Sequence, residues 1–96
     1  MIKESSPQYR IFVCINEKPS PKAYCLTGEG EKAVLWMKDE VKKRGLDKKL
    51  WITRTKCLGY CKPEGTVILF EPSHEQYSAV KFADIQKLFE DFVSKI

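Results

Sequence analysis

Four cysteines in a chain of 96 residues are the feature that most restricts how this protein folds. A domain of this size buries only about 60–65% of the surface of its unfolded chain, so a covalent or metal cross-link would help to stabilise it. Two disulfides, a metal or cluster site, and ordinary buried thiols are the three explanations that compete. Residues 1–7 contain no apolar stretch of the kind found in secretory signals. We therefore expect a cytoplasmic protein, and stable disulfides are rare in that compartment.

Length and composition indicate one globular domain. A chain of 96 residues fits the usual size of a single domain, and a hydrophobic content of 43% argues against disorder. No apolar stretch approaches the roughly 18 residues that a membrane span needs, so we expect no membrane association. We predict a flexible N-terminus over residues 1–8, followed by one domain over residues 9–96.

Local sequence patterns predict six elements. Short apolar, β-branched segments indicate strands at residues 9–15, 50–55, 66–70 and 76–80. Apolar residues at helical spacing indicate helices at residues 27–44 and 84–95. Thr27 is a suitable N-cap for the first helix, and Gly45 is a suitable C-terminal stop.

The predicted order β-α-β-β-β-α restricts the architecture. The first strand, helix and second strand should form a right-handed crossover between parallel strands, and the third and fourth strands should form an antiparallel hairpin. We therefore predict an α/β fold, a thioredoxin-like two-layer sandwich with a four-stranded mixed sheet and two main helices. Trp36 and Trp51 are interpreted as core or interface residues.

The predicted fold brings the cysteines to one edge of the sheet. Cys14 ends the first strand, Cys25 precedes the first helix, and Cys57 and Cys61 follow the second strand. Ligands of α/β folds bind at the carboxyl ends of parallel strands, and both cysteine-bearing loops should emerge there. Four thiolates can bind a [2Fe–2S] cluster, a [4Fe–4S] cluster or a structural zinc ion.

The spacing of the cysteines discriminates only partly between these groups. Zinc ribbons usually carry two C-x2–4-C pairs, and only Cys57 and Cys61 fit that pattern. The C-x-x-C motif of thioredoxin-type redox sites is absent, as are the ligand runs of bacterial and plant-type ferredoxins. His74 is the only histidine, which excludes a Rieske centre, and we interpret it as a turn residue.

Positive charge is concentrated in one part of the chain. The net charge is +4, and much of the excess comes from five residues, namely Lys42, Lys43, Arg44, Lys48 and Lys49. Such a cluster can bind nucleic acid or an acidic protein surface, or it can be a solvated helix end favoured by the helix dipole.

The residues around the cysteines resemble those of a known family. A strand ending in Val13-Cys14, a proline-containing loop to Cys25, and the sequence TKCLGYC at residues 55–61 resemble the thioredoxin-like [2Fe–2S] ferredoxins. The Cys-Leu-Gly-x-Cys segment is also similar to the cluster domain of the small flavoprotein-associated subunit of respiratory complex I. The resemblance extends from about Tyr9 to Ile96.

This resemblance implies a homodimeric one-electron carrier rather than an enzyme. It implies that Cys14, Cys25, Cys57 and Cys61 all bind one [2Fe–2S] cluster, and that electrons pass between protein redox partners. Two alternatives stay open: a zinc-binding structural module that contacts nucleic acid through residues 42–49, and a thiol-disulfide oxidoreductase that uses Cys57 and Cys61.

Cations close to the cysteines in the sequence would affect a bound cluster. Positive charge favours the more negative, reduced cluster and so raises its reduction potential. The candidates are Lys18, Lys22, Arg54, Lys56 and Lys62. We also expect the basic surface to select redox partners with acidic surfaces, although solvated lysines without a partner would explain the same composition.

Overall fold

The computed structural model describes residues 1–15, 29–56 and 65–96. Within this part of the chain the order of elements is the predicted β-α-β-β-β-α. The elements are β1 (Tyr9–Cys14), α1 (Glu29–Lys43), β2 (Leu50–Thr55), β3 (Thr66–Glu71), β4 (Glu75–Val80) and α2 (Phe82–Val93). Neither of these helices has both the length and the apolar character that crossing a membrane requires. Residues 1–8 contain no helix or strand, and their flexibility stays a prediction.

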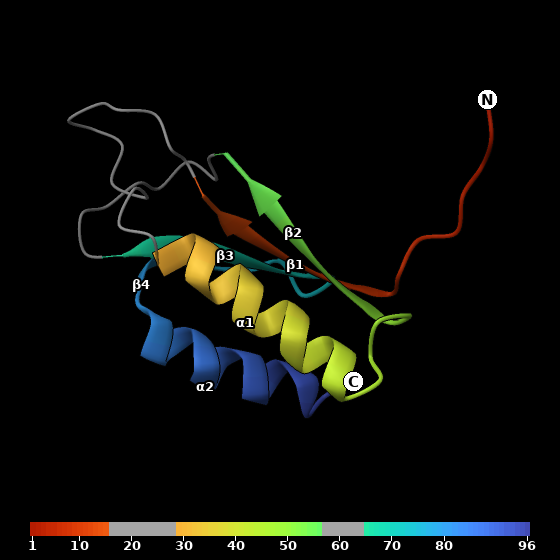
Figure 1. The fold of residues 1–96 in the computed structure, drawn as a ribbon. Helices are drawn as coiled ribbons and strands as arrows, with labels where there is room; N and C mark the ends of the chain where they lie inside the picture. The colour runs from red at the N-terminus through yellow and green to blue at the C-terminus, as the bar shows by residue number, and fades with distance from the viewer. Residues whose placement is uncertain (16–28, 57–64) are drawn as a thin grey trace.

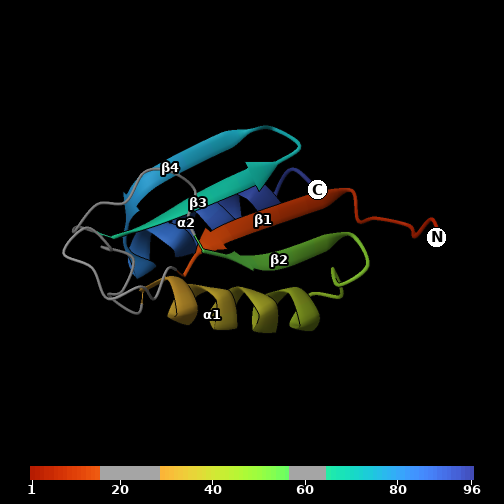
Figure 2. The same cartoon turned by 90° about the horizontal axis from the view of Figure 1, so that it is seen from above.

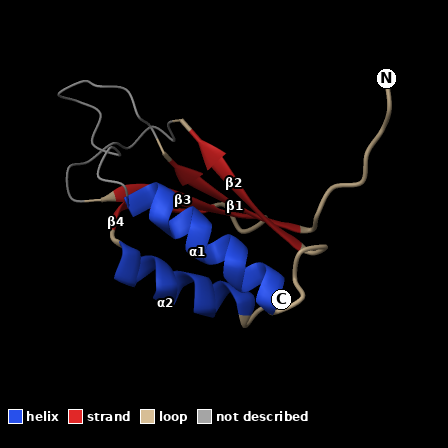
Figure 3. Cartoon of the chain, in the orientation of Figure 1, coloured by secondary structure: helices blue, strands red, loops and turns tan. Residues whose placement is uncertain are grey.

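The four strands form one mixed sheet in the order β2-β1-β3-β4. β1 and β2 are parallel, with Tyr9 opposite Leu50 and Cys14 opposite Thr55. β3 is antiparallel to both β1 and β4, which confirms the predicted hairpin. Figures 1 and 2 show α1 and α2 on the same face of this sheet, and Figure 3 shows the resulting helix and strand layers. The predicted thioredoxin-like two-layer sandwich is confirmed.

The predicted boundaries differ from the observed ones mainly at α2. This helix was expected at residues 84–95, but it begins at Phe82 and ends at Val93. The earlier start has a clear cause, because Asp84 is the third helical residue and its carboxylate accepts the backbone N–H of Lys81 at 3.1 Å. This is one half of a capping box, and it pairs the backbone donor of the N-cap residue at the start of the helix.

The structure tests the predicted C-terminal end of α1 but not its predicted N-cap. The expected N-cap Thr27 lies outside the described residues. The helix ends at Lys43, and Gly45 has a φ of 68°, the left-handed conformation expected of a glycine that terminates a helix. The predicted stop is therefore confirmed.

The core lies between the sheet and the two helices. Alternating residues Ile11 and Val13 of β1 are fully buried, and the residues of α1 that face them recur at helical spacing. These helical residues are Val34, Met37 and Val41. Two completely buried residues of α2, Ile85 and Phe89, close the core.

The two tryptophans have different environments. The Trp36 ring makes edge contacts with Phe82 and Phe89 of α2, with ring centroids 5.9 and 5.3 Å apart, so Trp36 is partly buried against the core. Trp51 on the edge strand β2 is 46% exposed, and the Arg10 guanidinium lies 5.1 Å from its ring centroid. Trp51 is therefore the tryptophan that remains accessible on the molecular surface.

Replacing Phe89 by alanine should destabilise the fold strongly. The side chain is completely buried against Trp36, so the substitution leaves a cavity and lowers the free energy of unfolding by about 3–5 kcal/mol. Urea denaturation measures this. The control is Leu35→Ala on α1, where the side chain is 57% exposed, and this change should stay within about 0.5 kcal/mol. Equal losses in the two variants would contradict this description of the core.

Candidate metal centre

Cys14 is the predicted ligand that lies within the described residues. It ends β1, it is fully buried, and it carries a free thiol. Its Sγ–H donates to the carbonyl oxygen of Lys56 at 3.1 Å, just beyond the end of β2. Cys25, Cys57 and Cys61 lie outside the described residues, so the structure tests neither their positions nor the complete set of ligands.

The chain enters and leaves both cysteine-bearing segments beside Cys14. The N–H of Ile15, which leads toward Cys25, donates to the carbonyl of Thr55 at 2.8 Å. The carbonyl oxygen of Lys56, which directly precedes Cys57, accepts the hydrogen bond from the Cys14 thiol. On the return side, the Thr66 hydroxyl donates to the Cys14 carbonyl oxygen at 2.7 Å. The predicted edge of the sheet therefore exists, and the described ends of both segments meet there.

Gly30 brings the first turn of α1 directly against the Cys14 backbone. A Cβ atom at this position would lie 2.3 Å from the Cys14 carbonyl oxygen and 3.2 Å from Thr66 Oγ1. The first distance is far below any van der Waals contact, so only glycine fits. The sequence analysis did not single out Gly30, although glycine inside the helix predicted at residues 27–44 is unfavourable and so was a weak signal.

Thr66 is the second residue that the sequence did not reveal. It is completely buried, and its hydroxyl would be costly to bury without the hydrogen bond to Cys14. The bond fixes the start of β3 against the end of β1. A threonine at the start of a strand is ordinary, so the sequence held no signal for this role.

The Arg54 charge is neutralised by a partner on α1. Its guanidinium donates from Nε and Nη2 to the two carboxylate oxygens of Glu31, at 2.9 and 2.8 Å. This hydrogen bonding lowers the pKa of Glu31 and raises that of Arg54. Of the cations expected near the cysteines, Arg54 is thus half of an ion pair, and Lys56 is exposed. Lys18, Lys22 and Lys62 lie outside the described residues.

The basic cluster at residues 42–49 lies at the opposite end of the sheet from Cys14. The Lys49 carbonyl accepts the N–H of Tyr9, the first residue of β1, whereas Cys14 is the last. The 15 residues of α1 separate the two ends by about 22 Å. Positive charge in this cluster is therefore remote from the predicted cysteine site.

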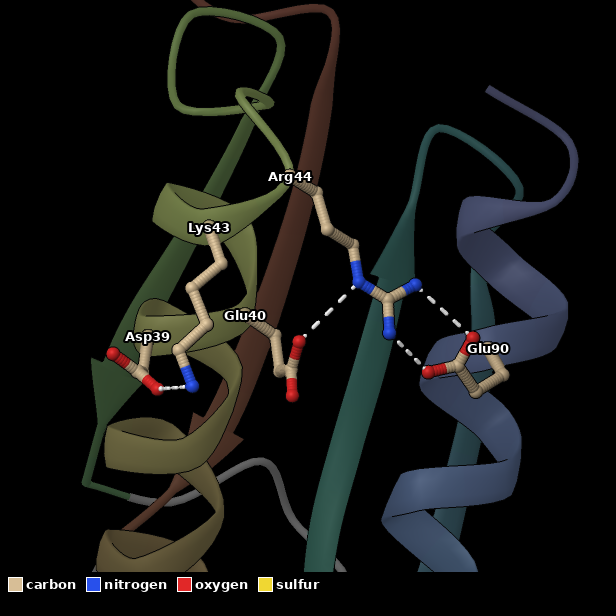
Figure 4. A network of polar contacts seen from close by, with 5 residues as sticks. All are labelled: Asp39, Glu40, Lys43, Arg44 and Glu90. Carbon is tan, nitrogen blue, oxygen red and sulfur yellow. Dashed lines mark hydrogen bonds and ion pairs between the residues drawn. The ribbon is translucent and has the colours of Figure 1, made fainter.

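Carboxylates compensate part of this basic cluster. Lys43 pairs with Asp39 at 2.8 Å, and Arg44 reaches from the end of α1 to Glu90 on α2 (Figure 4). Arg44 also contacts Glu40 at 3.4 Å. Hydrogen bonding to Arg44 lowers the pKa of Glu90. These pairs offset two of the five cations of the cluster, which weakens the electrostatic attraction that non-specific binding of nucleic acid depends on.

The described residues offer no competing metal site. Across residues 1–15, 29–56 and 65–96 there is no group of three or more His, Cys, Asp or Glu side chains that could hold a metal ion. His74 lies in the turn between β3 and β4 and contacts Glu71, as expected of a turn residue.

Comparison with solved structures identifies the fold. The wild-type thioredoxin-like [2Fe-2S] ferredoxin from Aquifex aeolicus matches with a TM-score of 0.78 and 22% identity, over 93% of this chain and 88% of that chain. A cysteine-to-serine variant of that ferredoxin matches with a TM-score of 0.78 and 21% identity, over 91% and 88%. No protein-family model and no curated protein sequence matches the chain. The chain has the thioredoxin-like ferredoxin fold that the sequence predicted.

Substituting Gly30 by alanine should disturb the Cys14 edge specifically. The added methyl group forces the Cys14 carbonyl and α1 apart, which should lower the free energy of unfolding by about 1–3 kcal/mol. The amide NMR signals of Cys14 and Thr66 should shift.

Gly45→Ala is the matched control for this substitution. Gly45 has open space around it and a positive φ, so alanine there should cost about 1–2 kcal/mol through backbone strain alone. The amides of Cys14 and Thr66 should not respond. Unchanged Cys14 and Thr66 signals in the Gly30 variant would contradict the close approach.

Proposed function

We propose that the chain is a one-electron carrier that holds a [2Fe–2S] cluster on Cys14, Cys25, Cys57 and Cys61. The observation that carries the proposal is the meeting, beside buried Cys14, of the chain ends that lead to the other three cysteines. The fold shared with the solved [2Fe-2S] ferredoxin supports it. When bound, the cluster would supply one-electron oxidation and reduction, so the chain itself needs no catalytic residue.

The environment of Cys14 suits a cluster ligand. Iron in such clusters is held by cysteine thiolates, and a buried site protects the cluster from water. The Cys14 side chain is completely shielded, and its backbone is held by both Gly30 and Thr66. Ligand orientation is therefore fixed by packing and by a hydrogen bond to the backbone.

The partner predictions become more specific in this proposal. A redox partner must approach the Cys14 end, because electron transfer weakens steeply with distance. An acidic partner would then find exposed Lys56 there, while the basic cluster at residues 42–49 lies at the far end. The homodimer stays a prediction, as does cytoplasmic localisation. Exposed Trp51 lies on a strand at the edge of the sheet and offers apolar surface for self-association.

Metal and sulfide analysis tests the proposal. We expect about two iron and two acid-labile sulfide ions per chain, a red-brown colour, and a rhombic paramagnetic signal after reduction. Cys14→Ser should lose or alter that signal. Thr55→Val changes a neighbouring residue at the same edge and should retain it. A colourless protein with one zinc ion per chain would favour the structural zinc module, and metal-free, reversibly oxidised thiols would favour the oxidoreductase.

Substituting Glu31 by glutamine should raise the reduction potential. The change removes a carboxylate and leaves the Arg54 guanidinium without its partner near the Cys14 edge. The unpaired positive charge stabilises the reduced cluster, so the reduction potential should rise by on the order of tens of millivolts. Potentiometric titration measures the shift.

Asp39→Asn is the control for the Glu31 variant. It removes the same charge from the same helix, nearer the end that points away from Cys14, and it also releases one cation, Lys43. Its effect on the potential should be much smaller. Equal shifts in the two variants would show that the cluster does not lie near the start of α1.

A further inference from the structure

A pocket of about 220 Å³ opens at the end of the sheet opposite Cys14. Its walls come from the first residue of β1, from the β3–β4 hairpin and from the second half of α2. None of its lining residues belongs to the predicted cysteine site. The pocket therefore needs an explanation separate from the proposed electron transfer.

Four aromatic rings form the inner wall of this pocket. Phe70 is almost completely buried, with its ring centroid 4.9 Å from Phe92 and 6.0 Å from Tyr77. Tyr9 in turn makes an edge contact with Phe92 at 5.9 Å. The rings hold one another in place, so the wall exists before any ligand arrives. Little ordering cost then opposes binding.

The residues that line the pocket carry a net negative charge. Glu75 of β4 and Asp91 of α2 both line the pocket. The Tyr77 hydroxyl donates to Glu75 at 2.8 Å, and this bond raises the pKa of Tyr77, with smaller contributions from burial and from the charges of Glu75 and Asp91. Lys95 is the one cation among the lining residues, and it is paired with Asp91 at 3.3 Å. The net charge of the rim is negative.

We propose that this pocket binds a small organic cation with an aromatic body, of the arylalkylammonium class. The ring of the ligand would lie against Phe70, Tyr77 and Phe92, and its ammonium group would meet the Glu75 carboxylate. Aromatic faces attract cations, and a nearby carboxylate adds to that attraction. Since a cavity of about 150 Å³ holds benzene, the present volume accommodates one ring with a short amine chain. An anionic ligand would be repelled at the same rim.

Titration with phenethylammonium, followed by NMR of the full chain with its native cofactor content, tests this proposal. We expect saturable shifts at Tyr77, Phe92 and Lys95. Affinity should be about tenfold higher than for 2-phenylethanol and higher still than for 3-phenylpropionate, which replace the ammonium by a neutral and by an anionic group.

Two variants locate the site, and a third is the control. Glu75→Gln should weaken phenethylammonium binding about fivefold to tenfold while leaving 2-phenylethanol binding unchanged. Leu88→Phe should fill the pocket and abolish binding of both. Asp39→Asn removes an exposed carboxylate outside the pocket lining and should have no effect. If Leu88→Phe lowers stability, the effect of Glu75→Gln on phenethylammonium binding still tests the proposed site.

Three results would overturn the proposal. One is the absence of saturable shifts at millimolar phenethylammonium, and another is equal affinity for the cationic, neutral and anionic probes. The third is a shift of the pocket signals with protein concentration alone, accompanied by dimer formation in sedimentation. That result would assign the pocket to contact between two copies of the chain.

Discussion

Parallel pairing of β1 with β2 is the constraint on which the rest of the structure depends. The register places Cys14 opposite Thr55, so the two strands end together at one edge of the sheet. Parallel strands must be joined by a crossover, and α1 is that crossover. Its first turn returns to the same edge, where Gly30 lies against the Cys14 backbone. One strand pairing therefore brings together chain segments that are far apart in the sequence.

The ends of the molecule differ in chemistry. The Cys14 end combines a buried thiol with the Arg54–Glu31 pair, while the far end carries the basic cluster and the aromatic pocket. The net charge of +4 is therefore not spread evenly, and the two ends of the molecule carry different local charges. Carboxylates on α1 and α2 compensate Lys43 and Arg44, so the charge that a partner meets depends on the end that it approaches.

Local periodicity was sufficient to predict the elements, and their β-α-β order then predicted the parallel pairing. The β-branched segment at residues 50–55 and the stop at Gly45 appear in the structure where the sequence placed them. The start of α2 was misplaced because its N-cap is Lys81, which is not one of the residue types that mark a helix start in the sequence. The Arg54–Glu31 pair and the Thr66–Cys14 bond join residues 23 and 52 positions apart. No local pattern predicts such contacts, since they exist only after the sheet and α1 have come together.

Diffraction at the iron absorption edge, on crystals of the protein as isolated, would locate the cluster. We expect two iron atoms beyond the carboxyl ends of β1 and β2, with one of them within bonding distance of Cys14 Sγ. The hydrogen bond from Cys14 to Lys56 would then be replaced by an iron–sulfur bond. No iron at this edge, with the Cys14 thiol still donating to the Lys56 carbonyl, would show that Cys14 is not a cluster ligand.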